Sequence, residues 1–153
     1  MHTISDPALY LQDYIETRIP LTAEMGIRVE SWDDRGLILT APFPPNRNDK
    51  GTAFGGSLSA LVTLAGWGLT FLFLRDAGIS ADVMVRRTRI DYERPVRGDI
   101  ATRCHMPEEQ ERNRFLEDVR RTGKARWTLI QEVAGNGLPA VTCEGLFVAV
   151  AAP

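Results

Sequence analysis

PFPPNRNDKGTAFGGSLSALVTLAGWGLTFLFLR, residues 42–75, joins a loop rich in Pro, Asn and Gly to a long apolar run. No residue from Leu58 to Leu74 is charged, so a helix through this run has no polar face. A helix that is apolar on all sides lies either in lipid or inside its own protein. Hydroxyl and glycine residues dilute the run, and alternating segments surround it. We therefore predict a helix from Ser57 to about Arg75 that the protein itself encloses.

The segments around this helix alternate apolar and polar residues, as half-buried strands do. We expect strands at 26–33 and 37–43 before the helix and at 82–93, 100–106, 126–134 and 140–149 after it. The charged segment 107–122 favours a short helix or a mobile excursion, and 7–19 has the spacing of an amphipathic helix with Asp6 as its N-cap. Short hairpins make the sheet antiparallel. The expected class is α+β, with a curved antiparallel sheet wrapped around one long apolar helix.

Size and charge restrict the possible functions. The 153 residues fit a single domain, 1–153, and a net charge of −2 favours neither a nucleic-acid nor a membrane partner. The two cysteines are too few for a disulfide framework, and the first residues have neither a basic start nor a long apolar run. These features predict a cytoplasmic protein. No spacing of metal ligands is visible, so we expect no metal.

Two motifs resemble the hotdog fold over nearly the whole chain: PPNRNDKGTAFGGSLSALVTLAGWGL, residues 44–69, and YERPVRGDI, residues 92–100. Within that fold the chain is similar to the thioesterase-like family typified by the YiiD C-terminal domain. Members of this family resemble bacterial proteins that are described as thioesterases or shown to decarboxylate malonyl-ACP. The resemblance implies an enzyme of the hotdog superfamily that acts on acyl groups carried by the phosphopantetheine of acyl carrier protein (ACP) or coenzyme A, with no other cofactor.

The start of the predicted helix is suited to hold an oxyanion. The first N–H groups of a helix have no internal partner and lie at the positive end of its dipole. Gly55 and Gly56 let a substrate approach this backbone closely. A thioester carbonyl gains negative charge during reaction, and a fixed donor there contributes roughly 3–4 kcal/mol. We predict Gly55 and Gly56 as catalytic donors, with Ser57 among the substrate-binding residues.

The resemblance also extends to Asn48. In related hotdog thioesterases an Asn precedes a His-Gly-Gly by six residues, and Asn48 precedes Phe54-Gly55-Gly56 by six. This implies that the Asn48 amide donates to the thioester carbonyl or positions a water, although a loop Asn also caps turns. The chain departs from the pattern twice, because Phe54 replaces the His and Thr63 stands where an acid is found.

These departures decide between mechanisms. Hydrolysis normally needs a residue that activates water, and Asp49 is the only acid near the motif. Decarboxylation of a malonyl thioester needs no base, only neutral donors for an enolate and an apolar surround. We therefore predict decarboxylation of malonyl-ACP to acetyl-ACP, a step that initiates fatty acid synthesis, with Asn48 and Thr63 in catalytic roles. A thioesterase that uses Asp49 or a water held by Thr63 is one alternative, and a non-catalytic acyl-carrier-binding domain is another.

The predicted binding partners follow from the remaining side chains. Phe54 and Trp67 are expected to contact the acyl group, together with Asp49 and Ser57. Arginines pair well with phosphate and carboxylate, so some of them are expected to contact the carrier. They form two groups: Arg86, Arg87, Arg89, Arg94 and Arg97, then Arg112, Arg114, Arg120, Arg121 and Arg126 with Lys124. We expect at least a homodimer, because the strand at 82–93 would otherwise leave a long exposed edge.

Overall fold

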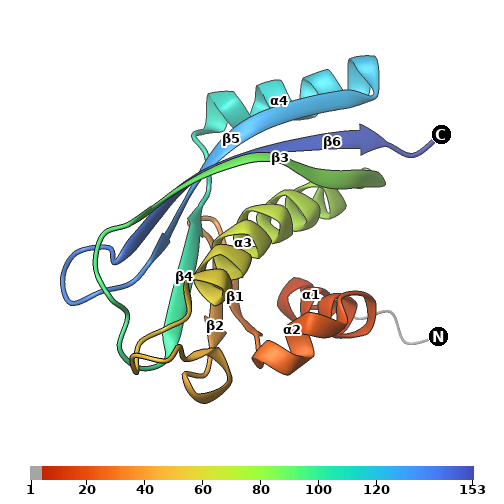
Figure 1. Ribbon diagram of the computed structural model, residues 1–153. Helices are drawn as coiled ribbons and strands as arrows, with labels where there is room; N and C mark the ends of the chain where they lie inside the picture. The colour runs from red at the N-terminus through yellow and green to blue at the C-terminus, as the bar shows by residue number, and fades with distance from the viewer. Residues whose placement is uncertain (1–4) are drawn as a thin grey trace.

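A computed structural model describes residues 5–153. Of the two histidines in the sequence, His2 lies outside the described residues. Figure 1 shows the sheet curving around α3, with α1 and α2 beside β1 and with α4 next to β5. In chain order the elements are α1 (Pro7–Arg18), α2 (Pro20–Met25), β1 (Arg28–Asp33), β2 (Gly36–Ala41), the short helix η1 (Pro44–Asn46), α3 (Gly55–Asp76), β3 (Ala81–Tyr92), β4 (Ile100–His105), α4 (Glu109–Thr122), β5 (Lys124–Val133) and β6 (Val141–Ala151).

The six strands form one antiparallel sheet in the order β1-β2-β4-β5-β6-β3. By length and composition α3 could cross a membrane, yet most of its apolar window is buried inside this protein. Its buried side chains face the inner residues of β2, β4, β5 and β6. The predicted fold class, a curved antiparallel sheet around one long apolar helix, is confirmed.

Glycines in α3 allow the helix to approach the sheet closely. A Cβ atom on Gly66 would overlap the Gln131 amide and the Phe147 ring, and a Cβ on Gly145 would lie 2.7 Å from Gln131 Nε2. The Gln131 side chain is fully buried, and neither of its amide atoms has a hydrogen-bond partner among residues 5–153. Gly66 therefore allows α3 to pack closely against Gln131 and Phe147 of the sheet.

The N-terminal region contains one helix that was predicted and one that was not. Asp6 caps α1 as expected, because its Oδ1 accepts from the Ala8 N–H at 2.8 Å. The second helix, α2, begins at Pro20 and ends at Met25, and its C-cap Gly26 has a φ of 69°, which glycine adopts readily. Six residues are too few to reveal a helical period in the sequence. Together α1 and α2 place Ile19 beside the exposed side of α3.

The charged segment after β4 folds as an ordered helix, α4. Its apolar side chains Phe115 and Val119 are buried, and the Phe115 ring stacks on Trp127 of β5 with centroids 4.0 Å apart. Phe73 near the end of α3 contacts both rings. The segment 107–122 is therefore a packed helix, not a mobile excursion, and it covers the C-terminal end of α3.

Most predicted element boundaries shift by one or a few residues. The second strand ends at Ala41, two residues earlier than expected, because η1 begins at Pro44 and Phe43 is already helical. The central helix begins at Gly55 rather than Ser57. This earlier start places both glycines of the motif in the first turn, where the backbone N–H groups are unpaired.

Candidate functional site

The first turn of α3 presents unpaired backbone donors. Its N-cap residue is Phe54, which has no oxygen in its side chain to accept from the first N–H groups. Within residues 5–153 no hydrogen bond is formed by the N–H groups of Gly55, Gly56 or Ser57, and the ladder of the helix starts with Leu58 N–H to Phe54 O. The dipole of a 22-residue helix ends at this turn. An oxygen with partial negative charge therefore has donors available here.

The loop before α3 is fixed by Asn46. This side chain is almost fully buried, and its amide donates to the carbonyls of Met25 and Pro42, both at 2.8 Å. The Asn46 backbone carbonyl accepts from Phe54 N–H at 2.7 Å, and Ala53 N–H donates to Val96 O at 2.8 Å. These bonds hold the start of the helix against the rest of the fold, so its donors are pre-organised.

Asn48 lies within this loop and closes a turn. Its Oδ1 accepts from the backbone N–H groups of Lys50 and Thr52, at 2.8 and 3.1 Å, and its Nδ2 donates to the Thr52 hydroxyl at 2.8 Å. Asn48 therefore caps a turn in the structure, which was one of the two roles that the sequence indicated for it. A carboxamide has two N–H donors, so one remains for a ligand. A role in substrate binding for Asn48 stays a prediction, and it rests on that second donor.

Phe54 and Tyr92 border the first turn of α3. The Phe54 ring lies directly against Gly56, where a Cβ atom would overlap it, and it is 55% exposed. The Tyr92 hydroxyl donates to the Gly55 carbonyl at 3.4 Å. The sequence predicted that Phe54 contacts the acyl group, but Tyr92 was not among the predicted site residues, although it opens the second motif. The position of Tyr92 at the end of a strand gave no sign that it would reach the helix.

A groove runs along the exposed side of α3, from its first turns to Trp67. It has a volume of about 320 Å³, and its walls are mostly apolar. Ser59 and Thr63 place hydroxyl groups in it, and Val85 of β3 lines it as well. Ser59 Oγ donates to Gly56 O, one turn earlier in the same helix, at 3.0 Å. The full lining is Ile19, Ser59, Ala60, Thr63, Leu64, Trp67 and Val85.

Thr63 has a hydroxyl group that is available for a ligand. Threonines in helices commonly donate back to a carbonyl one turn earlier, as Thr70 does to Gly66 O at 2.9 Å. Thr63 forms no such bond with any residue in the range 5–153 and faces the groove. The Thr63 hydroxyl is therefore not bonded to its own helix, and its catalytic role stays a prediction.

The remaining predicted residues lie at different depths. Asp49 is exposed, and its carboxylate pairs with Lys50 at 3.1 Å, so it is a solvated loop acid. Ser57 is buried in the first turn of α3. Trp67 lies at the far end of the groove. The structure thus places Phe54, Gly55, Gly56 and Ser57 at the helix start, Asn48 in the turn of the preceding loop, and Thr63 and Trp67 further along the groove.

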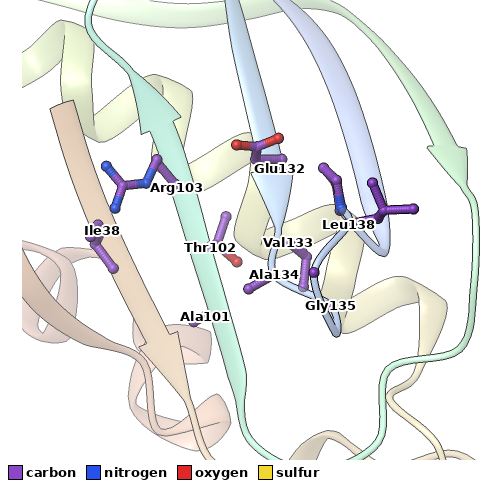
Figure 2. A pocket seen from close by; sticks show the side chains of 11 residues that line it. Ile38, Ala101, Thr102, Arg103, Glu132, Val133, Ala134, Gly135 and Leu138 are labelled. Atoms are coloured by element: carbon purple, nitrogen blue, oxygen red, sulfur yellow. The ribbon is translucent and has the colours of Figure 1, made fainter. Parts of the chain in front are cut away.

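A second cavity, also of about 320 Å³, opens between β4 and the β5–β6 hairpin. Figure 2 shows Ile38, Arg103, Glu132 and Leu138 around it. Glu132 lies 2.6 Å from His105, the one histidine in the described range. None of the predicted site residues lines this cavity. His105 and its acid are therefore separate from the groove on α3. Among residues 5–153 no group of His, Cys, Asp or Glu has an arrangement that could hold a metal ion.

Known proteins support this description of the fold. A family model described as "Putative thioesterase (yiiD_Cterm)" matches residues 8–151. A protein of unknown function from Chlorobaculum tepidum TLS is 34% identical, with a TM-score of 0.89 over 94% of this chain and 93% of its own. A structure from Shewanella oneidensis, titled as a putative thioesterase, is 27% identical, with a TM-score of 0.86 over 94% and 97%. A third, from Pseudomonas aeruginosa, shares the fold at 21% identity, with a TM-score of 0.79 over 96% and 97%.

Proposed function

Because the chain belongs to the YiiD C-terminal family of hotdog thioesterases, which act on acyl thioesters, we propose that it decarboxylates malonyl-ACP to acetyl-ACP. The observation that carries this proposal is a helix start with free, neutral donors and no acid within hydrogen-bond reach among the described residues. Such a site stabilises an enolate but has no evident group to activate water. The acyl group is carried on phosphopantetheine, and no further cofactor is proposed.

The reaction needs little from the protein besides binding and charge stabilisation. The bond between the carboxylate carbon and C2 of the malonyl group breaks, carbon dioxide leaves, and the electron pair forms an enolate on the thioester oxygen. C2 then takes a proton from water to give the acetyl thioester. The unpaired N–H groups of Gly55 and Gly56 suit the enolate oxygen, since donors fixed where charge develops lower the barrier. The second N–H of Asn48 would add another donor.

The surroundings of this turn favour loss of the carboxylate. The Phe54 ring and the apolar groove walls disfavour a charged group beside the helix. Thr63 lies seven residues after Gly56, about 10 Å of helix axis away, which is farther than a malonyl group extends from its carbonyl oxygen to its carboxylate. We therefore propose that the Thr63 hydroxyl that holds the malonyl carboxylate comes from the second subunit of the homodimer proposed below. The role predicted for Asp49 as a base finds no support in its position, because its side chain is exposed and paired with Lys50.

Hydrolysis is the second candidate, and one observation favours it. The Thr63 hydroxyl could hold a water in the groove instead of a carboxylate, and the family is described as thioesterases. The free hydroxyl would orient the water, although no base accompanies it. A non-catalytic acyl-carrier-binding domain is the third candidate, since the chain has neither the His nor the acid of related motifs.

We further propose that the protein is a cytoplasmic homodimer that pairs through β3. This strand is at one edge of the sheet, and its apolar side chains Met84 and Val85 are 46% and 45% exposed. A long free edge with apolar residues is a site of association. Because Val85 also lines the groove, pairing there would place the active site beside the subunit contact. The carrier is proposed to dock on the arginines of β3 and of the turn that follows it.

One experiment separates the three activities. The full chain is incubated with malonyl-ACP and, in parallel, with malonyl-CoA, and each carrier is weighed by mass spectrometry. Loss of carbon dioxide with the acetyl group still attached supports the proposal. Release of the free carrier thiol identifies a hydrolase and overturns it. A carrier that binds the protein but returns unchanged identifies a non-catalytic domain and overturns it as well.

A further inference from the structure

We infer that a cavity between the turn after β3 and the β5–β6 hairpin binds the phosphate of the pantetheine arm that carries the acyl group. This inference rests on the proposed function, because ACP and coenzyme A both present this phosphate. It gives a role to the second sequence motif, residues 92–100, whose Tyr92 contacts the start of α3. It also names two residues, Arg94 and Arg97, among the many arginines of the chain.

The cavity lies at the end of the sheet where α3 begins. It has a volume of about 390 Å³, and its lining includes Arg94, Arg97, Asp99 and Asn136. Figure 1 shows the green segment between β3 and β4 at the same end as the β5–β6 hairpin and the loop before α3. Hydrogen bonds tie this segment to both neighbours. Arg94 N–H donates to Ala140 O at 3.1 Å, and Val96 O accepts from Ala53 N–H at 2.8 Å.

The two guanidinium groups of the cavity suit a phosphate. Arg97 is exposed, and its side chain forms no hydrogen bond or ion pair within residues 5–153. Arg94 Nη1 donates to the Pro139 carbonyl, which holds this side chain against the hairpin and leaves its other N–H groups for a ligand. Arginine pairs with phosphate oxygens through parallel N–H bonds. The lining has these two arginines against one carboxylate, that of Asp99, so its charge favours an anion.

The phosphate of the arm can reach these arginines while the acyl carbonyl lies at the helix start. Val96 O lies 2.8 Å from Ala53 N, and Ala53 is two residues before Gly55. Two extended residues span about 7 Å, so the backbone of Arg97 lies within about 13 Å of the Gly55 N–H. From its sulfur to its phosphorus the pantetheine arm has about as many chain bonds as four residues, or roughly 15 Å when extended. The arm is therefore long enough to place its phosphate in the cavity.

The test compares the binding of probes that share one acyl group and differ in their phosphate. Each probe is a 2-oxopropyl thioether, which keeps a carbonyl but has no cleavable thioester. The four probes are built on pantetheine, phosphopantetheine, coenzyme A and ACP, and binding is measured by calorimetry. Wild type should bind the phosphopantetheine probe about tenfold more tightly than the pantetheine probe, because hydrogen bonds to a charged group are the strong ones.

Three variants assign this difference to the cavity. Arg97→Gln should bind the phosphopantetheine probe about fivefold more weakly than wild type does and the pantetheine probe equally well. Asp99→Asn removes the like charge, while its amide oxygen can still accept from Phe43 N–H, so the phosphopantetheine probe should bind about threefold more tightly. Arg103→Gln is the matched control, because Arg103 lines the cavity between β4 and the hairpin instead, and it should bind every probe as wild type does.

The ACP and coenzyme A probes identify the source of the phosphate. Weaker binding of the ACP probe by Arg97→Gln supports the inference with ACP as the carrier, and a loss confined to the coenzyme A probe supports it with coenzyme A. Equal binding of the pantetheine and phosphopantetheine probes by wild type overturns this inference alone, as do equal losses in Arg97→Gln and Arg103→Gln. If wild type binds none of the four probes, the proposed function is overturned, and this inference with it.

Discussion

The indole N–H of Trp67 donates to the carbonyl oxygen of Val83 across 2.9 Å, and this bond ties the middle of α3 to the edge strand β3. Trp67→Phe keeps an aromatic ring but removes the donor, so the Val83 carbonyl loses its partner. We expect the free energy of unfolding to fall by about 1–3 kcal/mol. Urea unfolding followed by circular dichroism measures it, and an unchanged midpoint would show that the bond contributes nothing.

Gly55→Pro tests the helix amides directly. Proline is tolerated at the first position of a helix, and Phe54 already has the extended conformation that a residue before proline requires. The substitution therefore removes one N–H with little change in the fold. Turnover should drop about 100- to 1000-fold, as for the loss of an oxyanion donor. Gly55→Ala retains the N–H, and its Cβ would lie 3.8 Å from the Tyr92 ring, so it should stay active. Full turnover by Gly55→Pro would contradict the proposed site.

Asn48→Asp separates substrate contact from turn formation. The carboxylate can still accept from Lys50 and Thr52, and the Thr52 hydroxyl can reverse its bond and donate, so the turn should persist. The new carboxylate at position 48 has no N–H to donate and repels an enolate, so we expect turnover to fall at least tenfold. Asn48→Ala would lose all three bonds and could not distinguish the two roles. Thr52→Val is the control and should keep turnover, whereas wild-type activity in Asn48→Asp would leave Asn48 a purely structural role.

Gly66→Ala should lower the free energy of unfolding, although replacing glycine by alanine in a helix usually raises it. Alanine in a helix is ordinarily more stable than glycine by about 0.5–1 kcal/mol. Here its Cβ would overlap the Gln131 amide and the Phe147 ring, and overpacking of this kind costs about 1–3 kcal/mol. The free energy of unfolding should therefore fall. In the double variant Gly66→Ala/Gln131→Ala part of the loss should be recovered, and strictly additive effects would show that the two residues do not interact.

The buried cysteines predict a dependence of stability on alkaline pH. Burial raises the pKa of Cys143 from 9.0 to about 11 and raises that of Cys104 further. The unfolded chain releases these protons near pH 9, while the folded chain keeps them. Their contribution to stability is therefore complete below pH 9 and is lost as the pH rises above 9, by roughly 1.4 kcal/mol per pH unit for each thiol. For Cys143 the loss ends near pH 11, and for Cys104 it continues to higher pH. Urea unfolding at several pH values measures the slope, and Cys143→Ala should flatten it.

Much of the fold was predictable because its decisive segments obey simple periodicities. A helix through the uncharged run from Leu58 to Leu74 must be buried by the rest of the protein. The alternating segments form the sheet that buries it. The helix α2 was not predictable, because six residues show no period. For the segment of α4 the sequence left open a short helix or a mobile excursion. The contact of Phe115 with Trp127 decides for the helix, and this tertiary contact could not be predicted from the charged residues of the segment itself.

The candidate site was predictable only in its backbone. The spacing of Asn48, Gly55 and Gly56 indicated a loop and a helix start. It did not show that Asn48 would use most of its hydrogen-bonding capacity on the turn, since Lys50 and Thr52 offer donors only once the loop is folded. The approach of Tyr92 to Gly55 joins residues 37 positions apart, and no local pattern reports it.

Phe54 occupies a helix position at which Ser, Thr, Asp and Asn are preferred, and a residue of that kind would typically raise the melting temperature through about 1 kcal/mol of added stability. Such a side chain would also satisfy the amides that we propose bind the acyl oxygen. Selection for heat resistance and selection for catalysis therefore oppose each other at this one position. Sequence libraries sorted only for thermostability should converge on polar residues at position 54 and lose function as they do so.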